Sequence, residues 1–294
     1  IYIHRRNTRV GDVMSNFSDF IGGGGGGALP VNIVLGHSQT WVPPVDGNIC
    51  IHVVGAGGSG RGRIPSYSGG AGGYCKKNSL AVTTSGSFTV VVGAGGQGTS
   101  GSVAGNNGGN TTVSGTGLSA TLTANGGGGA PYPANSNGAG GTAANGDVNN
   151  TGGAGGSKGG GAVGITGTGN AGGSQNYDQN GGDCDVVGPE SLMGYGYICG
   201  GIGGKAWVNG TGTVYTNYAS YGVITYPPDG NGGFLAGGGQ YECQANGVQA
   251  HAYGGKGGIG GGGGGCFNNS GGQHLYSSSG DGGNGIVIIQ YLPA

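Results

Sequence analysis

The stretch Gly55-Ala56-Gly57-Gly58-Ser59-Gly60 decides the fold, because it repeats with a period of three residues. Positions 55 and 58 share one edge, 57 and 60 share a second, and Ala56 and Ser59 form the third. A left-handed helix of the polyproline-II type has three residues per turn and no hydrogen bonds within itself. Helices with bare glycine edges facing one another can exchange those bonds between backbones. The stretch therefore predicts a bundle of polyglycine-II helices, with third-edge side chains such as Lys205, Lys256 and Ile259 pointing outward.

The same register recurs along the chain, where glycine supplies 84 of 294 residues. It is found at 93–98, 138–142, 152–157, 200–205, 254–265 and 280–285. Collagen is excluded, because the chain has only 10 prolines and no unbroken run with glycine at every third residue. Disorder is disfavoured, because only 7% of the residues are charged and the polar backbone must find partners internally.

Short apolar or alternating runs bounded by glycine predict β-strands. They cover 31–35, 49–54, 80–84, 88–92 and 118–124, and the closing run Ile286–Tyr291 is expected to return and pair with the early strands. The glycine density predicts no α-helix. The expected class is mainly β plus irregular structure, with a small β-rich layer and a polyglycine-II bundle joined by long loops. Three regions are expected: an arm with a glycine hinge at 1–30, interleaved strands and glycine tracts at 31–125, and the bundle with its loops at 126–294.

The opening segment 1–30 carries a basic cluster and the six-glycine run 22–27. The cluster consists of His4, Arg5, Arg6 and Arg9. We expect an attachment arm, with a solvated tail as the alternative, and no nucleic-acid site, because four basic residues alone do not make one. No apolar run reaches the length of a transmembrane helix, so membrane insertion is not expected.

Four segments interrupt the glycine background and hold most of the tyrosines: 175–199, 206–229, 240–253 and 266–279. Tyrosine offers a large apolar face and one hydroxyl at low entropic cost, as recognition loops require. The alternative is that the rings cap the open ends of the helices. The predicted receptor-binding residues are Tyr177, Tyr195, Tyr197, Trp207, Tyr215, Tyr218, Tyr221, Tyr226, Tyr241, Tyr253 and Tyr276.

Two stretches, 55–60 and 93–98, match the dinucleotide fingerprint G-x-G-x-x-G after a predicted strand. No helical pattern follows either, and no Asp or Glu lies between Asp46 and Asp147 to hold a ribose. The histidines are scattered and no G-x-S-x-G elbow occurs. We therefore predict neither an enzyme nor a cofactor.

Metal binding is also not expected. Asp178, Asp183 and Asp185 lie close in sequence but do not follow the spacing of a calcium-binding EF-hand loop, so a polar turn is favoured over a calcium site. The six cysteines form no C-x-x-C pair, which argues against zinc. Disulfide bridges and isolated buried thiols both remain open for them.

A series of motifs in order resembles the glycine-rich domain of bacteriophage tail-fibre proteins over about 40–291. The motifs are Thr40-Trp41-Val42-Pro43, Ile49-Cys50-Ile51-His52-Val53-Val54-Gly55-Ala56-Gly57-Gly58, Gly69-Gly70-Ala71-Gly72-Gly73-Tyr74, Phe88-Thr89-Val90-Val91-Val92-Gly93-Ala94-Gly95-Gly96, Leu122-Thr123-Ala124-Asn125-Gly126-Gly127 and Gly282-Gly283-Asn284-Gly285-Ile286-Val287-Ile288-Ile289-Gln290-Tyr291. The later tracts and tyrosine loops are similar to the tip adhesins of T-even phage long tail fibres. Those adhesins carry a longer amino-terminal domain than the segment 1–30, which leaves the mode of attachment open.

The resemblance implies a virion adhesin, extracellular when it functions, that recognises a bacterial surface protein or glycan and joins a fibre shaft or another virion protein through 1–30. One alternative is a purely structural virion fibre or decoration protein. An ice-binding protein and a glycine-rich domain of an animal receptor are further alternatives. Long loops argue against the ice-binding reading, since a flat bundle face with short turns would be expected there.

Overall fold

The computed structural model describes residues 32–62, 67–156, 159–173, 181–185, 232, 235–242, 251–265 and 276–293. All of them belong to one unit, Val31–Ala294, and the separate unit Ile1–Pro30 lies outside the described residues. The prediction of an attachment arm at 1–30 therefore concerns a segment on which the structure is silent.

The described residues form thirteen strands, and no helix occurs among them. The strands are β1 (Asn32–Leu35), β2 (Gln39–Trp41), β3 (Gly47–Val54), β4 (Tyr74–Val82), β5 (Phe88–Val91), β6 (Thr111–Gly115), β7 (Leu122–Ala124), β8 (Ala143–Ala144), β9 (Val148–Asn150), β10 (Gln240–Glu242), β11 (His251–Gly254), β12 (Tyr276–Ser278) and β13 (Ile286–Tyr291). The predicted class, mainly β without α-helix, is confirmed for this part of the chain.

The strands form three sheets, which we name A, B and C. Sheet A has the order β1-β13-β3-β4-β9, sheet B the order β2-β5-β6-β7-β8, and sheet C the order β10-β11-β12. Sheets A and B are antiparallel throughout, whereas β11 and β12 pair in parallel. The closing strand β13 lies between β1 and β3, so the predicted return to the early strands is confirmed.

Several predicted strands have different bounds in the structure. Strand β4 begins six residues before the predicted start at Leu80, because its polar first half still pairs with β3. Strand β7 keeps only the end of the predicted run 118–124. Sheet C lies in segments that we expected to be loops, since its strands are too short and too polar to stand out as periodic runs.

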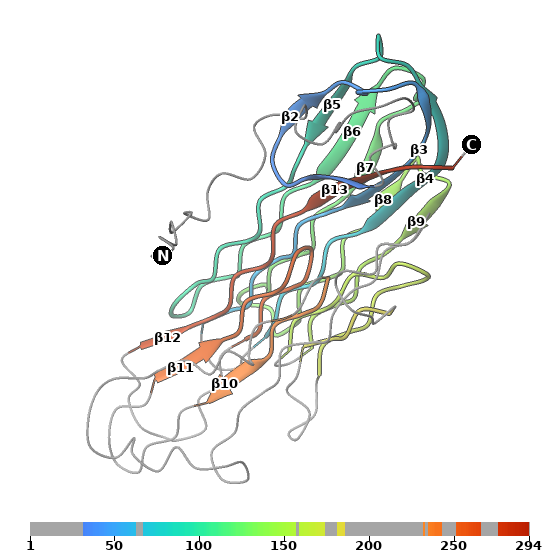
Figure 1. Ribbon diagram of the computed structural model, residues 1–294. Helices are drawn as coiled ribbons and strands as arrows, with labels where there is room; N and C mark the ends of the chain where they lie inside the picture. The colour runs from blue at the N-terminus through green and yellow to red at the C-terminus, as the bar shows by residue number, and fades with distance from the viewer. Residues whose placement is uncertain are drawn as a thin grey trace, which may run out of the picture. The chain divides into compact units, whose positions relative to one another are not determined.

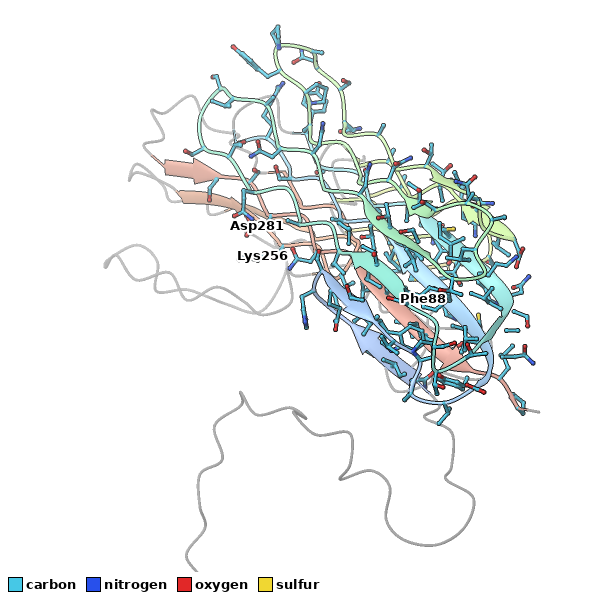
Figure 2. All side chains as sticks on the ribbon, turned by 90° about the horizontal axis from the view of Figure 1, so that it is seen from above. Phe88, Lys256 and Asp281 are labelled. Carbon is cyan, nitrogen blue, oxygen red and sulfur yellow. The ribbon has the colours of Figure 1, made fainter. Side chains whose placement is uncertain are left out.

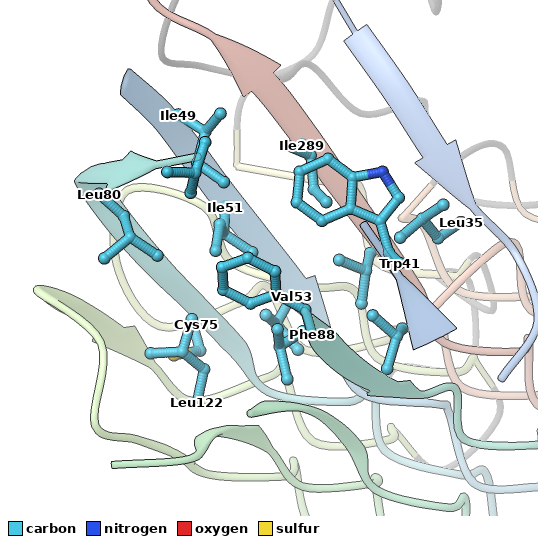
Figure 3. Close-up of a cluster of buried hydrophobic side chains, with 14 of the residues drawn as sticks. Leu35, Trp41, Ile49, Ile51, Val53, Cys75, Leu80, Phe88, Leu122 and Ile289 are labelled. Atoms are coloured by element: carbon cyan, nitrogen blue, oxygen red, sulfur yellow. The ribbon is translucent and has the colours of Figure 1, made fainter. Parts of the chain in front are cut away.

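An apolar cluster fills the space between sheets A and B (Figure 3). Ile49, Ile51 and Val53 alternate along β3 toward this cluster, as expected for one face of a strand. Trp41 and Phe88 meet within it, with ring centroids 5.4 Å apart. This cluster is a β-sandwich core of the ordinary kind.

The other face of sheet A is buried as well. Val54, Ile286 and Ile288 face a second cluster, to which Val163 and Leu235 contribute from glycine tracts. Burial on both faces explains why the first four residues of β13 form an unbroken apolar run instead of an alternating one.

The central strands continue directly into glycine tracts, which we call rods. The antiparallel pairing of β3 with β4 ends at Val54 opposite Tyr74, and the next bond runs from the Gly55 N–H to the Gly73 carbonyl. From there the bonds recur at every third residue, with Gly58 donating to Gly70 and Arg61 to Tyr67. A β-ladder would bond alternate residues. The three-residue period predicted from the sequence is therefore the hydrogen-bonding period of the rods.

The rod 55–61 is bonded on all sides. Successive N–H groups of the rod donate in turn to three neighbouring segments, at 2.8 to 3.2 Å, and its carbonyl oxygens accept from three other segments. The rod donates to carbonyl oxygens in 67–73, 106–109 and 280–283. It accepts from N–H groups in 93–98, 127–130 and 260–265. A β-strand has two hydrogen-bonded neighbours at most, so this arrangement is a bundle and not a sheet.

The prediction that third-edge side chains point outward is correct only at the margin of the bundle. Lys256 is largely exposed, but Ile259 is partly buried against the second cluster, and Lys205 lies outside the described residues. Ala56 and Ser59 are completely buried. The rod that carries them is enclosed on all sides, which leaves no outward edge and restricts its third edge to small residues.

Side-chain oxygens replace backbone partners where rods reach the surface. The amides of Asn107 and Asn110 accept from the N–H groups of Gly129 and Gly126. Asp281 and Asn284 do the same for Gly98 and Gly95. Both pairs are three residues apart, so the polar third-edge residues extend the period of the ladder. In Figure 1 the rods run between the strands of sheets A and B at one end and sheet C at the other.

Candidate functional site

Sheet C receives three of the predicted receptor-binding residues. The register places Tyr241 of β10 opposite Tyr253 of β11, and Tyr276 of β12 opposite His251. The backbone thus brings together three tyrosines that are up to 35 positions apart in the sequence. The remaining predicted residues lie outside the described part of the chain: Tyr177, Tyr195, Tyr197, Trp207, Tyr215, Tyr218, Tyr221 and Tyr226.

Parts of two predicted loops, 243–250 and 266–275, border the strands of this sheet. The segment 243–250 follows Glu242 and precedes His251, and the segment 266–275 follows the rod that ends at Gly265 and precedes Tyr276. A further described turn joins them, because Ser100 forms an isolated bridge with Ser278. The strands of sheet C therefore carry three of the predicted tyrosines at the end of the rods away from sheets A and B (Figure 1), whereas 243–250 and 266–275 themselves contain no tyrosine.

The longest tyrosine segment attaches elsewhere. Residues 186–231 follow Asp185, and the chain is described again at Gly232, whose N–H donates to the Lys256 carbonyl. Asp185 lies beside Ile165, a member of the second cluster next to sheet A. The predicted recognition residues therefore do not share one point of attachment. Six tyrosines and Trp207 lie between Asp185 and Gly232, Tyr177 lies between Gly173 and Gly181, and three tyrosines lie on sheet C, a division that sequence spacing did not reveal.

The carboxylate of Asp185 accepts four hydrogen bonds from a neighbouring turn. The N–H groups of Ile165, Thr166 and Gly167 and the Thr166 hydroxyl all donate to it, at 2.7 to 3.2 Å. Burial raises the pKa of this carboxyl, but the four hydrogen bonds outweigh burial and hold the pKa below its ordinary value. The polar turn favoured from the sequence agrees with this geometry. Asp183 is exposed, and Asp178 lies outside the described residues.

Arg61, which was not predicted as a functional residue, binds a loop that begins at the end of another rod. Arg61 ends the rod 55–61 and is only 1% exposed. Its guanidinium donates to the carbonyls of Pro131 and Ala134, at 2.9 and 3.1 Å, and to the side-chain oxygen of Asn135 at 3.4 Å. One cation thus gathers three acceptors from a single loop, residues 131–137, which we call the Tyr132 loop.

The same guanidinium lies over two aromatic rings. Its central carbon is 4.9 Å from the ring centroid of Tyr67 and 5.4 Å from that of Tyr132. Such cation–π contacts are stronger when the cation is desolvated. Tyr132 is nevertheless 50% exposed, so a residue that contacts a buried cation keeps about half of its surface open to solvent.

The Tyr132 loop was missed because it lies in a short turn and not in one of the long tyrosine-rich segments. Two signals in the sequence could have found it. Pro131 and Pro133 flank the tyrosine and restrict the backbone. Arg61 is also a long cationic side chain in a tract of otherwise small residues, which needs a partner if the tract is buried.

The sheets and rods lie in a region that matches a known protein family. A family described as a glycine-rich domain matches residues 32–292. The chain belongs to this family. No curated protein matches the chain. The matched region of the glycine-rich domain contains every strand of sheets A, B and C, so the family spans the sandwich and the rods together.

The glycine-rich domain also buries a cluster that resembles a nucleophile with its base. His52 lies 3.4 Å from the Cys50 sulfur, 2.7 Å from the Tyr74 hydroxyl and 2.8 Å from the Gln290 side-chain oxygen. Because Gln290 also donates to Asn32, its oxygen faces His52, so Nε2 carries the proton and Nδ1 accepts from Tyr74.

Burial makes this cluster unreactive. It lowers the pKa of His52 to about 4, although the Gln290 hydrogen bond opposes the shift, and it raises the pKa of the Cys50 thiol to about 11. A protonated thiol is a poor nucleophile. The cluster is therefore a satisfied polar network inside sheet A.

The remaining described cysteines and acidic residues give no sign of a metal centre. Cys50, Cys75 and Cys184 are buried and form no disulfide bridge, so for these three the structure favours buried thiols over bridges. Cys199, Cys243 and Cys266 lie outside the described residues. Within the described ranges no group of three or more His, Cys, Asp or Glu side chains could hold a metal ion. No helix long and apolar enough to cross a membrane occurs among those residues either.

Proposed function

We propose that the chain is a bacteriophage tail-fibre adhesin, a receptor-binding protein of the virion. It recognises a bacterial surface protein or glycan through loops on a polyglycine-II scaffold. It acts by binding, without catalysis and without a cofactor or metal. Residues 1–30 join it to the fibre shaft or to another virion protein.

One observation carries the proposal: loops attach to the ends of rods that are held by hydrogen bonds to several neighbouring rods. Residues 243–250 join β10 to β11, residues 266–275 lie between the rod end Gly265 and β12, and the Tyr132 loop begins where a rod ends at Ala130. A rigid base lowers the entropic cost that a loop pays on binding. Binding residues are commonly found on loops that a rigid scaffold positions.

The order of glycine and strand motifs supports the same proposal, because it resembles the glycine-rich domain of phage tail-fibre proteins. The eleven predicted aromatic residues add chemistry suited to protein loops and sugar rings alike.

The test is binding of the fluorescently labelled chain to a panel of bacterial strains, with a variant that lacks residues 211–227 and the triple variant Tyr215→Ser, Tyr218→Ser, Tyr221→Ser. We expect binding to particular strains that falls in both variants, while their near-ultraviolet circular dichroism stays that of the wild type. A folded wild-type chain that binds no strain in a broad panel would overturn the proposal.

A purely structural virion fibre is the second candidate, and the enclosed rod 55–61 favours it. Hydrogen bonds to six neighbours make a stiff element without any need for recognition. This candidate predicts that the triple variant assembles into virions and leaves adsorption to host cells unchanged.

A further inference from the structure

We propose that the Tyr132 loop is a saccharide-binding subsite of the adhesin, in which the exposed face of Tyr132 stacks on a neutral sugar ring. The inference rests on the proposed function and narrows its receptor class to a surface glycan. It names a site outside the long tyrosine segments, and every residue that it uses is described by the structure.

The ring is held in place before any ligand arrives. Arg61 is buried, covers one side of Tyr132, and donates to the Pro131 and Ala134 carbonyls on both sides of it. The guanidinium fork is planar and loses little freedom for each bond that it forms. Arg61 is thus a positioning residue, and Tyr132 presents its open side without paying an ordering cost on binding.

The groups around the ring suit sugar hydroxyls. Residues 131–137 contain no charged side chain, and Asn135 and Ser136, three and four positions after the tyrosine in the same loop, are exposed. The Asn135 oxygen accepts from Arg61, which turns its amide N–H groups away from the guanidinium as donors. An exposed aromatic ring in a loop that also carries amide and hydroxyl groups suits both surfaces of a sugar ring, the apolar C–H face and the polar rim.

The size of the surface favours a saccharide over a protein. A stable protein interface buries about 800 Å² on each partner, whereas one half-exposed ring with two small polar side chains offers the area of about one sugar unit. The absence of charge in the loop also gives a charged protein surface nothing to pair with. The uncharged loop therefore matches a neutral glycan.

The experiment uses cells of a strain that the wild-type chain binds, either untreated, oxidised with periodate to open sugar rings, or shaved with protease. We expect Tyr132→Ala to weaken binding to untreated cells about tenfold, and Tyr132→Phe to keep most of it. Val103→Ala is the matched control, because Val103 is similarly exposed (55%) on another described turn. Periodate should abolish binding and protease should leave it.

A double-mutant cycle tests the role of Arg61. Arg61→Met should weaken binding on its own but add little to Tyr132→Ala, because it acts through the ring. A merely structural role would make the two losses add.

The outcomes separate the two proposals. Wild-type binding with an unaffected Tyr132→Ala variant would overturn the subsite and leave the adhesin standing. Binding that survives periodate and is lost on protease treatment would overturn the saccharide assignment in favour of a protein receptor. Absence of wild-type binding to every strain would overturn the adhesin and the subsite together.

Discussion

The sandwich of sheets A and B and the rods that extend from it are two solutions to one problem, the burial of a polar backbone. In the sandwich, alternating side chains such as Ile51, Val53 and Phe88 fill the core, and strands pair only with lateral neighbours. In the rods, backbones bond directly to one another, and the enclosed rod 55–61 does so with neighbours all round. The sandwich depends on side-chain volume and the rods depend on its absence.

This difference predicts opposite responses to added and removed methyl groups. The sandwich should suffer when atoms are taken away, because a cavity remains. The rods should suffer when atoms are added, because rigid backbone stands where the new atoms must go. The predictions below test this contrast, starting from the largest expected effect.

Gly57→Ala should abolish folding. A Cβ at position 57 would overlap the carbonyl of Gly261 in the neighbouring rod. Overpacking by side chains costs about 1–3 kcal/mol because rotamers can adjust. Here a whole rod would have to move and give up its own ladder, which approaches the roughly 5–15 kcal/mol total stability of a domain. Circular dichroism and soluble yield measure the loss.

Gly36→Ala is the matched control. A Cβ at position 36 meets nothing within 4 Å, so the free energy of unfolding should change by less than about 1 kcal/mol. Equal effects at the two positions would show that composition, and not close approach of the rods, selects glycine.

Phe88→Ala should reduce the free energy of unfolding by about 3–5 kcal/mol, the usual cost of removing a buried phenylalanine. Phe88 is 1% exposed and packs against Trp41 between the two sheets. Chemical denaturation gives the value. Val91→Ala, on the exposed side of the same strand, should cost under about 1 kcal/mol, and a similar cost for both would contradict a side-chain core in the sandwich.

The rods were more predictable from the sequence than the strands. One short repeat, 55–60, indicated the period and the two bare edges, and edges without side chains let backbones approach closely enough to exchange hydrogen bonds. The strands of sheet C and the polar start of β4 gave no such signal. Their pairing is set by neighbours that are distant in sequence, such as β3 for β4.

Only the residue types of the candidate site could be predicted from the sequence, and not their arrangement in space. Tyrosine enrichment pointed to Tyr241, Tyr253 and Tyr276, but their convergence on one sheet depends on register. The Arg61 clamp on the Tyr132 loop joins residues about seventy positions apart, 70 to Pro131 and 73 to Ala134. Contacts of that range follow from the packing of rods, which local spacing does not encode.

Sheet A should lose stability in acid because of His52. Its folded pKa is about 4 and its ordinary pKa is 6.5, so between these values the unfolded chain binds a proton that the native state does not. The stabilising contribution is complete above pH 6.5 and is lost as pH falls through 4. A difference of about 2.5 pKa units corresponds to roughly 3 kcal/mol. Denaturation curves from pH 7 to 4.5 measure the slope.

His52→Gln should flatten that slope, since the variant has no proton to gain at this position, although it is less stable at pH 7. His37→Gln serves as the control, because His37 is exposed on the turn between β1 and β2. A slope that persists in His52→Gln would assign the acid sensitivity to other groups.

Substitutions at Lys256 and Asp281, which are labelled in Figure 2, should give the smallest effect. They distinguish the contribution of the ion pair from that of the hydrogen bond to the rod. Their ion pair is 3.0 Å long, but the lysine side chain is 68% exposed, and exposed pairs contribute about 0–1 kcal/mol. Asp281 also accepts from the Gly98 N–H at 2.7 Å and so replaces a backbone partner at the margin of the bundle. Lys256→Met should therefore change the free energy of unfolding by less than about 0.5 kcal/mol, whereas Asp281→Ala should cost about 1–3 kcal/mol, because it leaves a rod N–H unpaired. Asp281→Asn keeps an oxygen at that position and should behave like Lys256→Met. If Asp281→Asn were as harmful as Asp281→Ala, the charge and not the hydrogen bond would hold the margin, and the backbone ladder would not be the principal support of the rods.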